Sequence, residues 1–213
     1  MEYLPLFLRL RGAPVLLVGG GAVALRKARL LLRAGADLHV VAPQLCAEMQ
    51  QLLDEQGGNW RKGDYSTGDL DGCVLAVSAT DEAAVNQSVS ADARARDIPV
   101  NVVDNPDLCT ALFPSIVDRN PLLIAIGSGG RSPVLARILR RKIESMVPSA
   151  YGRLTDFAGR MRGRVKDALP EDTPRRLFWE QALEGAMGEQ VMAGREDRAR
   201  ELLEEKLADT DAL

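Results

Sequence analysis

The stretch "VLLVGGGAVALRKARLLLRAGADLHVVAP", residues 15–43, decides the expected fold of this chain. The apolar run Pro14–Val18 ends in glycines, which predicts a buried strand. Alanine, leucine and valine then recur at helical spacing over Ala22–Ala34, and Gly35 is the expected C-terminal cap of that helix. A second apolar strand follows over residues 37–43. The pattern predicts a βαβ unit with parallel strands.

The alternation of strands and helices continues beyond this unit. The runs Cys73–Ala79 and Ile98–Val103 predict two more strands, and the segment from about Asp81 to Arg96 predicts the helix between them. Such alternation is typical of a parallel sheet covered by helices on both faces. We therefore expect an α/β fold, with a Rossmann-like, dinucleotide-binding domain over residues 1–112.

The pattern changes after residue 112. Two apolar runs flank a turn at Asp118–Pro121, which predicts an antiparallel β-hairpin. A helix is expected to follow, with Ser132 as its N-cap and Pro133 at its first position. We assign the hairpin and this helix to a segment of residues 113–148.

The remaining residues, 149–213, predict a C-terminal helical domain. They are amphipathic and rich in arginine, with expected breaks at Pro170 and Pro174, and they end in a charged helix that runs into a polar terminus. Their apolar stripes exceed what so short a region can bury alone, so we expect core packing and contacts within a homodimer.

Composition excludes several classes of protein. Aromatic residues make up only 4% of the 213 residues and the net charge is −3, which argues against stacking of nucleic-acid bases and against general binding of polyanions. The three cysteines form no CxxC pair and His39 is the only histidine, so we expect no zinc site or other metal ligand set. With neither a signal-peptide pattern nor a membrane-length apolar run, we expect a cytoplasmic protein.

A glycine-rich turn predicts a dinucleotide site. Gly19, Gly21 and Ala24 form G-x-G-x-x-A between the first strand and its helix. In this motif the first glycine allows a tight turn, the second lets the pyrophosphate approach the backbone, and a small third residue lets helix and strand pack closely. The free N–H groups of the helix N-terminus then bind phosphate.

The acid expected at the end of the second strand is absent, because that position holds Ala42, Pro43 and Gln44. The adenosine ribose must then be held by backbone groups or by Gln44. No arginine stands at this strand end to bind a 2′-phosphate, which favours NAD over NADP. Thr80 and Asp81 follow another strand, where the cofactor crevice of such a sheet is expected.

Longer stretches carry a family resemblance. "YLPLF", the glycine turn with its helix, "AVSATDEAAVN" and "NVVDNPDLCTALFPSIVDRNPLLIAIGSGGRSPVLAR" together resemble the precorrin-2 dehydrogenase/sirohydrochlorin ferrochelatase family, in the form of the N-terminal module of sirohaem synthase. The resemblance implies NAD-dependent oxidation of precorrin-2 to sirohydrochlorin, followed by insertion of ferrous iron, a substrate, to give sirohaem. It implies a homodimer, with residues 113–148 as its dimerisation segment, and tetrapyrrole substrates.

The resemblance also implies site residues. They are NAD contacts at Gly21, Ala22, Val23, Pro43 and Gln44, a general base at Asp104, and Ser128 in the "SGG" turn. From its position after a strand, Asp104 either accepts a proton or forms an Asx-type turn before Pro106. Asn101 either orients the substrate or satisfies backbone groups at the strand end.

The expected substrate carries many carboxylates, and a cluster of cations is a candidate site for them. Ser128 and Gly129 lie in a glycine turn that leads into a helix N-terminus, a ready anion site. Arg131 precedes this helix, and Arg137, Arg140 and Arg141 share one of its faces. The alternative is that these arginines form a solvated helix surface.

Two other functions compete with this enzyme. An NAD-sensing dimeric regulatory module would bind NAD without depending on Asp104. An unrelated short-chain oxidoreductase is disfavoured, because none of Tyr3, Tyr65 and Tyr151 has a lysine four residues later.

Overall fold

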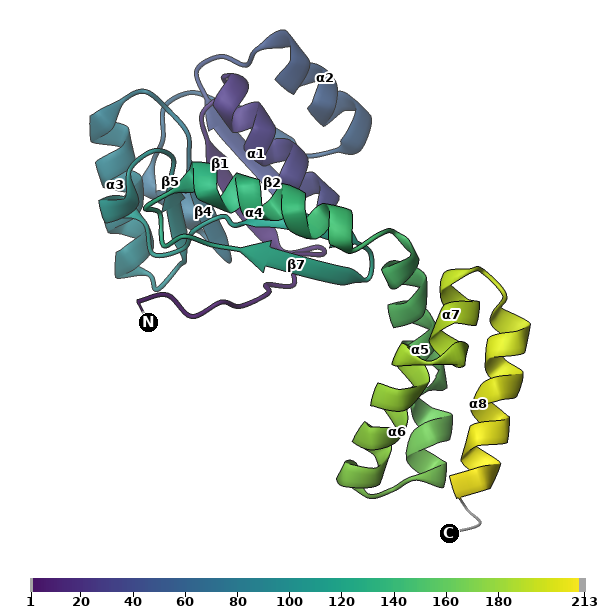
Figure 1. Cartoon of the computed structure of the whole chain (residues 1–213). Coiled ribbons are helices and arrows are strands. Elements are labelled where there is room, and N and C mark those ends of the chain that lie inside the picture. The colour runs from purple at the N-terminus through teal and green to yellow at the C-terminus, as the bar shows by residue number, and fades with distance from the viewer. Residues whose placement is uncertain (1, 211–213) are drawn as a thin grey trace. The chain divides into compact units, whose positions relative to one another are not determined.

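The computed structural model describes residues 2–210 of the chain (Figure 1). They divide into two compact units. The first contains the residues up to Phe113 together with Gly129–Arg131, and the second contains Pro114–Ser128 and Ser132 onward. Within the described residues, no helix has the length and apolar character needed to cross a membrane.

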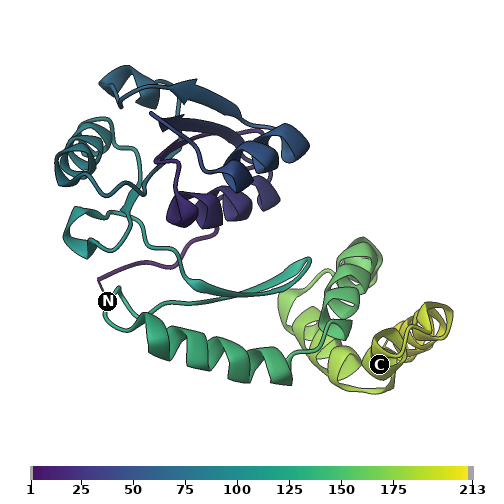
Figure 2. The same cartoon turned by 90° about the horizontal axis from the view of Figure 1, so that it is seen from above.

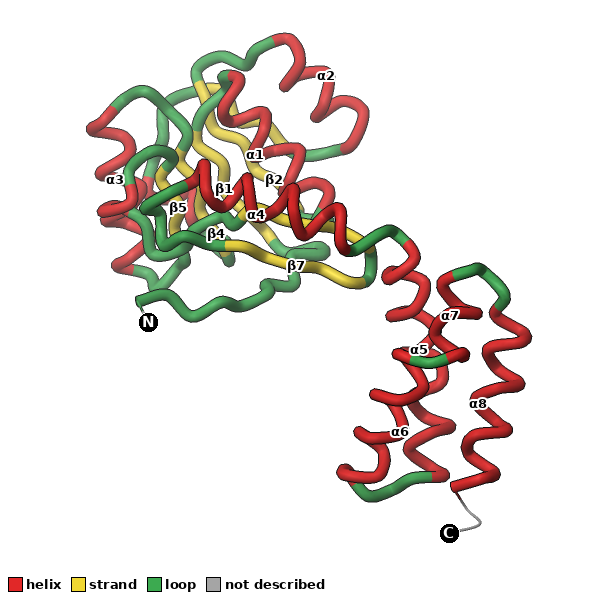
Figure 3. Tube along the Cα trace, in the orientation of Figure 1, coloured by secondary structure: helices red, strands yellow, loops and turns green. Residues whose placement is uncertain are grey.

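The first unit is built on a five-stranded parallel sheet with the order β3-β2-β1-β4-β5. Its strands are β1 (Pro14–Val18), β2 (Asp37–Ala42), β3 (Asn59–Lys62), β4 (Leu75–Ser78) and β5 (Val100–Val102). Its helices are α1 (Ala22–Arg33), α2 (Ala47–Gln56) and α3 (Ala83–Ala95), with single 3₁₀ turns η1 (Thr67–Leu70) and η2 (Pro106–Leu108). The Rossmann-like prediction is confirmed (Figure 3), and α2 and β3 are additions that the sequence pattern did not indicate.

Both faces of this sheet are buried, because successive residues of a strand point to opposite sides. In β1, Val15 and Leu17 join a cluster with the apolar faces of α1 and α2. Leu16 and Val18 join a second cluster with α3 and η1. All four side chains are at most 4% exposed. The continuous apolar run at 14–18 is thus explained by burial on two sides.

The second unit begins with an antiparallel hairpin, as predicted. Its strands are β6 (Ser115–Arg119) and β7 (Leu122–Ile126), and the helix α4 (Pro133–Met146) lies alongside them (Figure 2). The Ser132 hydroxyl accepts a hydrogen bond from the Leu135 N–H at 3.3 Å, so the predicted N-cap is confirmed. The Arg119 guanidinium donates to the carbonyl of Val147 at 2.7 Å and ties the hairpin to the end of α4.

Four further helices complete this unit around an apolar core that includes Phe157, Val165 and Leu203. They are α5 (Ala150–Ala168), α6 (Asp172–Glu184), α7 (Ala186–Met192) and α8 (Glu196–Thr210). The predicted break at Pro170 is confirmed. The predicted break at Pro174 is wrong, since Pro174 lies in the first turn of α6, where a missing N–H costs no helical hydrogen bond. Most of the predicted polar terminus lies outside the described residues.

Candidate functional site

A cavity of about 300 Å³ lies at the carboxyl ends of the sheet strands in the first unit. Segments that follow four neighbouring strands line it: the turn after β1, the ends of β2 and β3, and the start of the loop after β4. All eight predicted cofactor residues are among its lining: Gly19, Gly21, Ala22, Val23, Pro43, Gln44, Thr80 and Asp81. The fold therefore brings together side chains and backbone that are up to 62 positions apart, from 19 to 81.

The first two glycines are required by close packing. Gly19 has a φ of +123°, and a Cβ at this position would lie 2.4 Å from the carbonyl oxygen of Ala79. A Cβ at Gly20 would lie 2.0 Å from the carbonyl oxygen of Gln44. The Gly20 carbonyl also accepts a hydrogen bond from the Cys46 N–H at 2.8 Å. The G-x-G-x-x-A pattern does not include the glycine at position 20. Glycine is needed there because the loop after β2 packs against it.

Gly21 differs from its two neighbours. A Cβ at Gly21 would meet no atom within 4 Å, and the residue lines the cavity as the N-cap of α1. No side chain caps this helix, so the N–H groups of its first turn are open to a ligand. Ala24 is fully buried, as its packing role requires. Open space over Gly21 beside uncapped N–H groups fits the pyrophosphate of a dinucleotide.

Asp104 has an unusual backbone. Its φ is +59°, a left-handed conformation that only glycine, asparagine and aspartate adopt readily. The preceding residue, Val103, still donates to the Ser78 carbonyl at 2.9 Å, so Asp104 is the first residue to leave the sheet after β5. Its exposed carboxylate accepts no hydrogen bond from any described residue. An Asx-type turn would need the N–H of residue 106, and Pro106 has none.

Lys27, on α1, is a half-buried cation that the sequence reasoning missed. Its Nζ lies 4.0 Å from the centre of the Phe113 ring. Burial, followed by the charge of Arg26, lowers the pKa of Lys27, while the nearby Cys109 and Asp104 act in the opposite direction. It makes no ion pair within 4.0 Å to a described carboxylate. The Asp104 carboxylate is thus near enough to Lys27, in the same unit, to raise the pKa of the lysine.

Asn101 is buried in β5. Its amide donates to the carbonyl oxygen of Ala111 at 2.9 Å and approaches the Cys109 thiol at 3.6 Å. The same thiol accepts from the N–H of Val102 at 3.2 Å. These contacts correspond to the second interpretation of Asn101, in which it satisfies backbone groups at the end of the strand.

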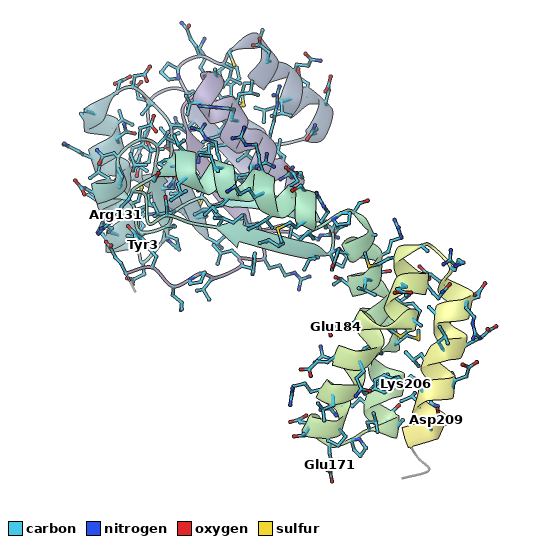
Figure 4. All side chains as sticks on the ribbon, in the orientation of Figure 1. Tyr3, Arg131, Glu171, Glu184, Lys206 and Asp209 are labelled. Carbon is cyan, nitrogen blue, oxygen red and sulfur yellow. The ribbon has the colours of Figure 1, made fainter. Side chains whose placement is uncertain are left out.

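The predicted anion-binding residues are distributed over both units. Ser128 accepts a hydrogen bond from the Ser132 N–H at 3.0 Å, and the Gly129 backbone is left-handed, with a φ of +61°. Arg131 is 85% exposed and has its Nη2 atom 3.9 Å from Glu2, near the start of the chain (Figure 4). Two arginines of α4, Arg137 and Arg141, are exposed.

Arg140, which shares their face of α4, pairs with Glu144 at 2.7 Å and is thereby occupied on its own helix. Among residues 2–210, no three histidine, cysteine, aspartate or glutamate side chains gather as a metal site.

Three family models match successive parts of the chain. Residues 6–115 match a model for NAD(P) binding, residues 119–146 match the central region of a sirohaem biosynthesis protein, and residues 150–207 match the sirohaem synthase dimerisation region. Among solved structures, "SirC, precorrin-2 dehydrogenase" has a TM-score of 0.73 at 23% identity and covers 95% of this chain and 100% of its own. At that identity it supports the fold.

Curated relatives share about half of their aligned residues with this chain. "Siroheme synthase" of Azotobacter vinelandii is 54% identical over 208 residues, and that of Pseudomonas fluorescens (strain SBW25) is 51% identical over 207 residues. The alignments cover 98% and 97% of this chain but 45% of each relative, so the chain spans less than half the length of the proteins it matches. On the strength of these matches, the chain belongs to the sirohaem synthase family.

Proposed function

We propose that this chain oxidises precorrin-2 to sirohydrochlorin with NAD and then inserts ferrous iron to give sirohaem. One observation carries the proposal: the Asp104 carboxylate, which makes no hydrogen bond or ion pair within residues 2–210, follows β5 in the unit whose strand ends form the dinucleotide cavity. The names of the relatives, which specify sirohaem synthesis and precorrin-2 dehydrogenation, agree with it. The chain has three free cysteines, Cys46, Cys73 and Cys109. Free thiols are typical of a reducing cytoplasm, where we expect the reaction to occur.

The oxidation removes two hydrogens from the macrocycle. One of them leaves with both electrons as a hydride, for which NAD bound in the cavity would supply the acceptor. The Asp104 carboxylate takes the other as a proton, because an ionised carboxylate in this position is a general base. Gly21 and the N–H groups of the first turn of α1 hold the pyrophosphate, which fixes the cofactor relative to the sheet.

Iron insertion also requires a group of the protein that accepts protons. The four nitrogens of the tetrapyrrole are the ligands of the incoming Fe²⁺, and two of them release a proton as the metal enters. Asp104 accepts protons in this step as well, so the protein needs no metal cage of its own. A single carboxylate then serves both reactions on nearly the same macrocycle.

The carboxylates of the tetrapyrrole require cationic partners. We assign this role to Arg131, Arg137 and Arg141, together with the backbone of Ser128 and Gly129. All three guanidinium groups are exposed, and their charge-assisted hydrogen bonds to carboxylates would be among the stronger polar contacts available. Arg140 is left out because Glu144 already occupies it.

We further propose that the protein is a homodimer. Several large apolar side chains are exposed on α4 and β7, among them Val134 at 58%, Leu135 at 50% and Leu123 at 44%. Light scattering at micromolar concentration should give twice the chain mass of 23.1 kDa, and Leu139→Glu on the same helix should weaken association. A wild-type mass equal to one chain would refute the dimer.

The proposed reactions are tested directly by mixing the purified chain with precorrin-2 and NAD and following the absorbance spectrum with and without Fe²⁺. We expect conversion to the sirohydrochlorin spectrum with NAD alone and to the sirohaem spectrum when iron is added. A chain that binds NAD yet leaves precorrin-2 unchanged would instead be the NAD-sensing regulatory module.

A further inference from the structure

We propose that Asp64 is the ribose-binding acid of this site and sets its preference for NAD over NADP. The inference rests on the proposed use of NAD and adds a residue that decides cofactor choice. Dinucleotide folds usually place this acid at the end of the second strand, where its carboxylate accepts hydrogen bonds from the ribose hydroxyls. Here Ala42, Pro43 and Gln44 occupy that strand end.

The neighbouring strand supplies the missing carboxylate. β3 runs parallel to β2 with Lys62 opposite Ala42, and the Gly63 N–H donates to the Ala42 carbonyl at 3.2 Å. The chain after β3 therefore leaves the sheet at the same edge as the chain after β2. Asp64 lies two residues beyond β3 and lines the same cavity as Pro43 and Gln44.

A network of polar contacts holds the loop that carries Asp64. The Arg61 guanidinium donates to the Asp64 carbonyl oxygen at 2.8 Å and, through two nitrogens, to the Asp69 carboxylate, with Nε to Oδ1 at 2.7 Å. Asp69 in turn accepts from the Ser66 N–H at 2.7 Å. The loop is thus tied at both ends of the stretch that contains Asp64, so the backbone that carries its carboxylate is held before a ligand arrives.

The Asp64 carboxylate itself is available. It is exposed and makes no hydrogen bond or ion pair within the described residues. Its two oxygens can accept hydrogen bonds from the two hydroxyls of a ribose. A 2′-phosphate in that place would bring its negative charge against the carboxylate, which is how an acid discriminates against NADP.

The guanidinium of Arg61 does not neutralise the negative charge that the Asp64 carboxylate presents to a ligand in the cavity. Arg61 is engaged with Asp69 and with the Asp64 backbone, and it lines a separate cavity together with Asp69 and Asp71. It is not among the residues that line the dinucleotide cavity. Asp81 and Glu82 do line that cavity, but they follow β4, on the opposite side of β1 from β2 and β3.

The test is calorimetric titration of the whole chain with NAD, NADP and 2′-deoxy-NAD, for wild type, Asp64→Asn and Glu55→Gln. The Glu55 variant removes one exposed acid from α2, outside the cavity, and is the matched control. Wild type should bind NAD roughly 10- to 100-fold more tightly than either analogue, because charge-assisted hydrogen bonds are of that size. Asp64→Asn should lose most of both preferences, and Glu55→Gln should keep them.

Three results would overturn the inference, and they differ in meaning. If Asp64→Asn keeps both the wild-type affinity for NAD and its preference over NADP, Asp64 is not the ribose acid, although the NAD site stands. If wild type binds no NAD at all, the proposed function fails with it. Equal affinities of the wild-type chain for NAD and 2′-deoxy-NAD would also refute the inference. This measurement does not depend on the folding of any variant.

Discussion

The predicted cofactor half and the predicted substrate half of the proposed site are arranged differently. Every predicted cofactor residue lines one cavity, at the ends of adjacent strands of one sheet. The predicted substrate residues are dispersed: Asp104, Asn101, Gly129 and Arg131 belong to the first unit, and Ser128, Arg137 and Arg141 to the second. The predicted cofactor residues therefore come from three loops, after β1, β2 and β4, that meet at one cavity. The predicted substrate residues lie within positions 101–141 of the chain, yet they are divided between the two units.

The comparison predicts that the two halves can be disabled separately. Gly21→Asp places a side chain and a negative charge in the open space over the turn, so NAD binding and oxidation should be abolished. Iron insertion into supplied sirohydrochlorin should remain near wild type, since it uses no NAD. Calorimetry and the two absorbance assays measure these outcomes. Unchanged NAD affinity in a folded variant would show that the cofactor lies elsewhere.

Asp104 should affect both reactions. Removal of a general base typically lowers a rate by ~10²- to 10⁴-fold, so Asp104→Ala should reduce oxidation and iron insertion by amounts in that range while NAD affinity is kept. Asp104→Asn is the matched variant, because asparagine tolerates the left-handed backbone at φ +59° but cannot accept the proton in the same way. If both variants keep near-normal rates, the single-base mechanism is wrong.

Within the cofactor half, adjacent glycines should have unlike effects on stability. Gly20→Ala forces a Cβ to within 2.0 Å of the Gln44 carbonyl oxygen and should lower the free energy of unfolding by about 1–3 kcal/mol, as overpacking does. The Cβ that Gly21→Ala adds would meet no atom within 4 Å, so this variant should have nearly the stability of wild type. It should nevertheless weaken the binding of NAD. Urea denaturation of both variants measures this difference. Equal losses in the free energy of unfolding would mean that the loop after β2 adjusts freely to the added Cβ.

The smallest expected effect concerns Lys27, on α1 of the first unit. Its pKa is lowered in the folded state, so the charged form is disfavoured there relative to the unfolded chain. This cost to stability is fully present below the folded-state pKa and disappears as the pH rises towards the unfolded value near 10.5. Lys27→Met should therefore raise the melting temperature slightly at pH 7, with a smaller gain at alkaline pH. A clear loss of stability would identify Lys27 as a structural residue.

Sequence patterns predicted the elements whose residues repeat with a clear period. β1 and α1 are examples, since their apolar residues are buried against neighbours on the sheet and its helix layer. β3 was missed because its residues, Asn59–Lys62, are all exposed at the edge of the sheet and show no apolar run. Without β3 in the expected sheet, the position of Asp64 beside Gln44 could not be inferred.

The same limit applies to individual residues. Gly20 was not singled out because its constraint comes from Gln44, which lies 24 positions away in the chain. Lys27 reads as one more cation on the polar side of a helix, and only the folded chain places the ring of Phe113 beneath it. The absent N–H of Pro106, by contrast, is visible in the sequence, although the Asx-type turn stayed open there as an alternative for Asp104.

The position of β1 at the centre of the sheet has a consequence for amide hydrogen exchange. β1 is paired on both sides and buried on both faces, so its amides should open only with global unfolding and exchange last. β5 is a three-residue strand at the end of the sheet, and its amides should open through smaller, more frequent fluctuations. The glycine turn thus extends from the slowest-exchanging strand, while Asp104 extends from one of the fastest. Under the proposed mechanism, local opening at β5 would move Asp104 while NAD stays bound at the glycine turn.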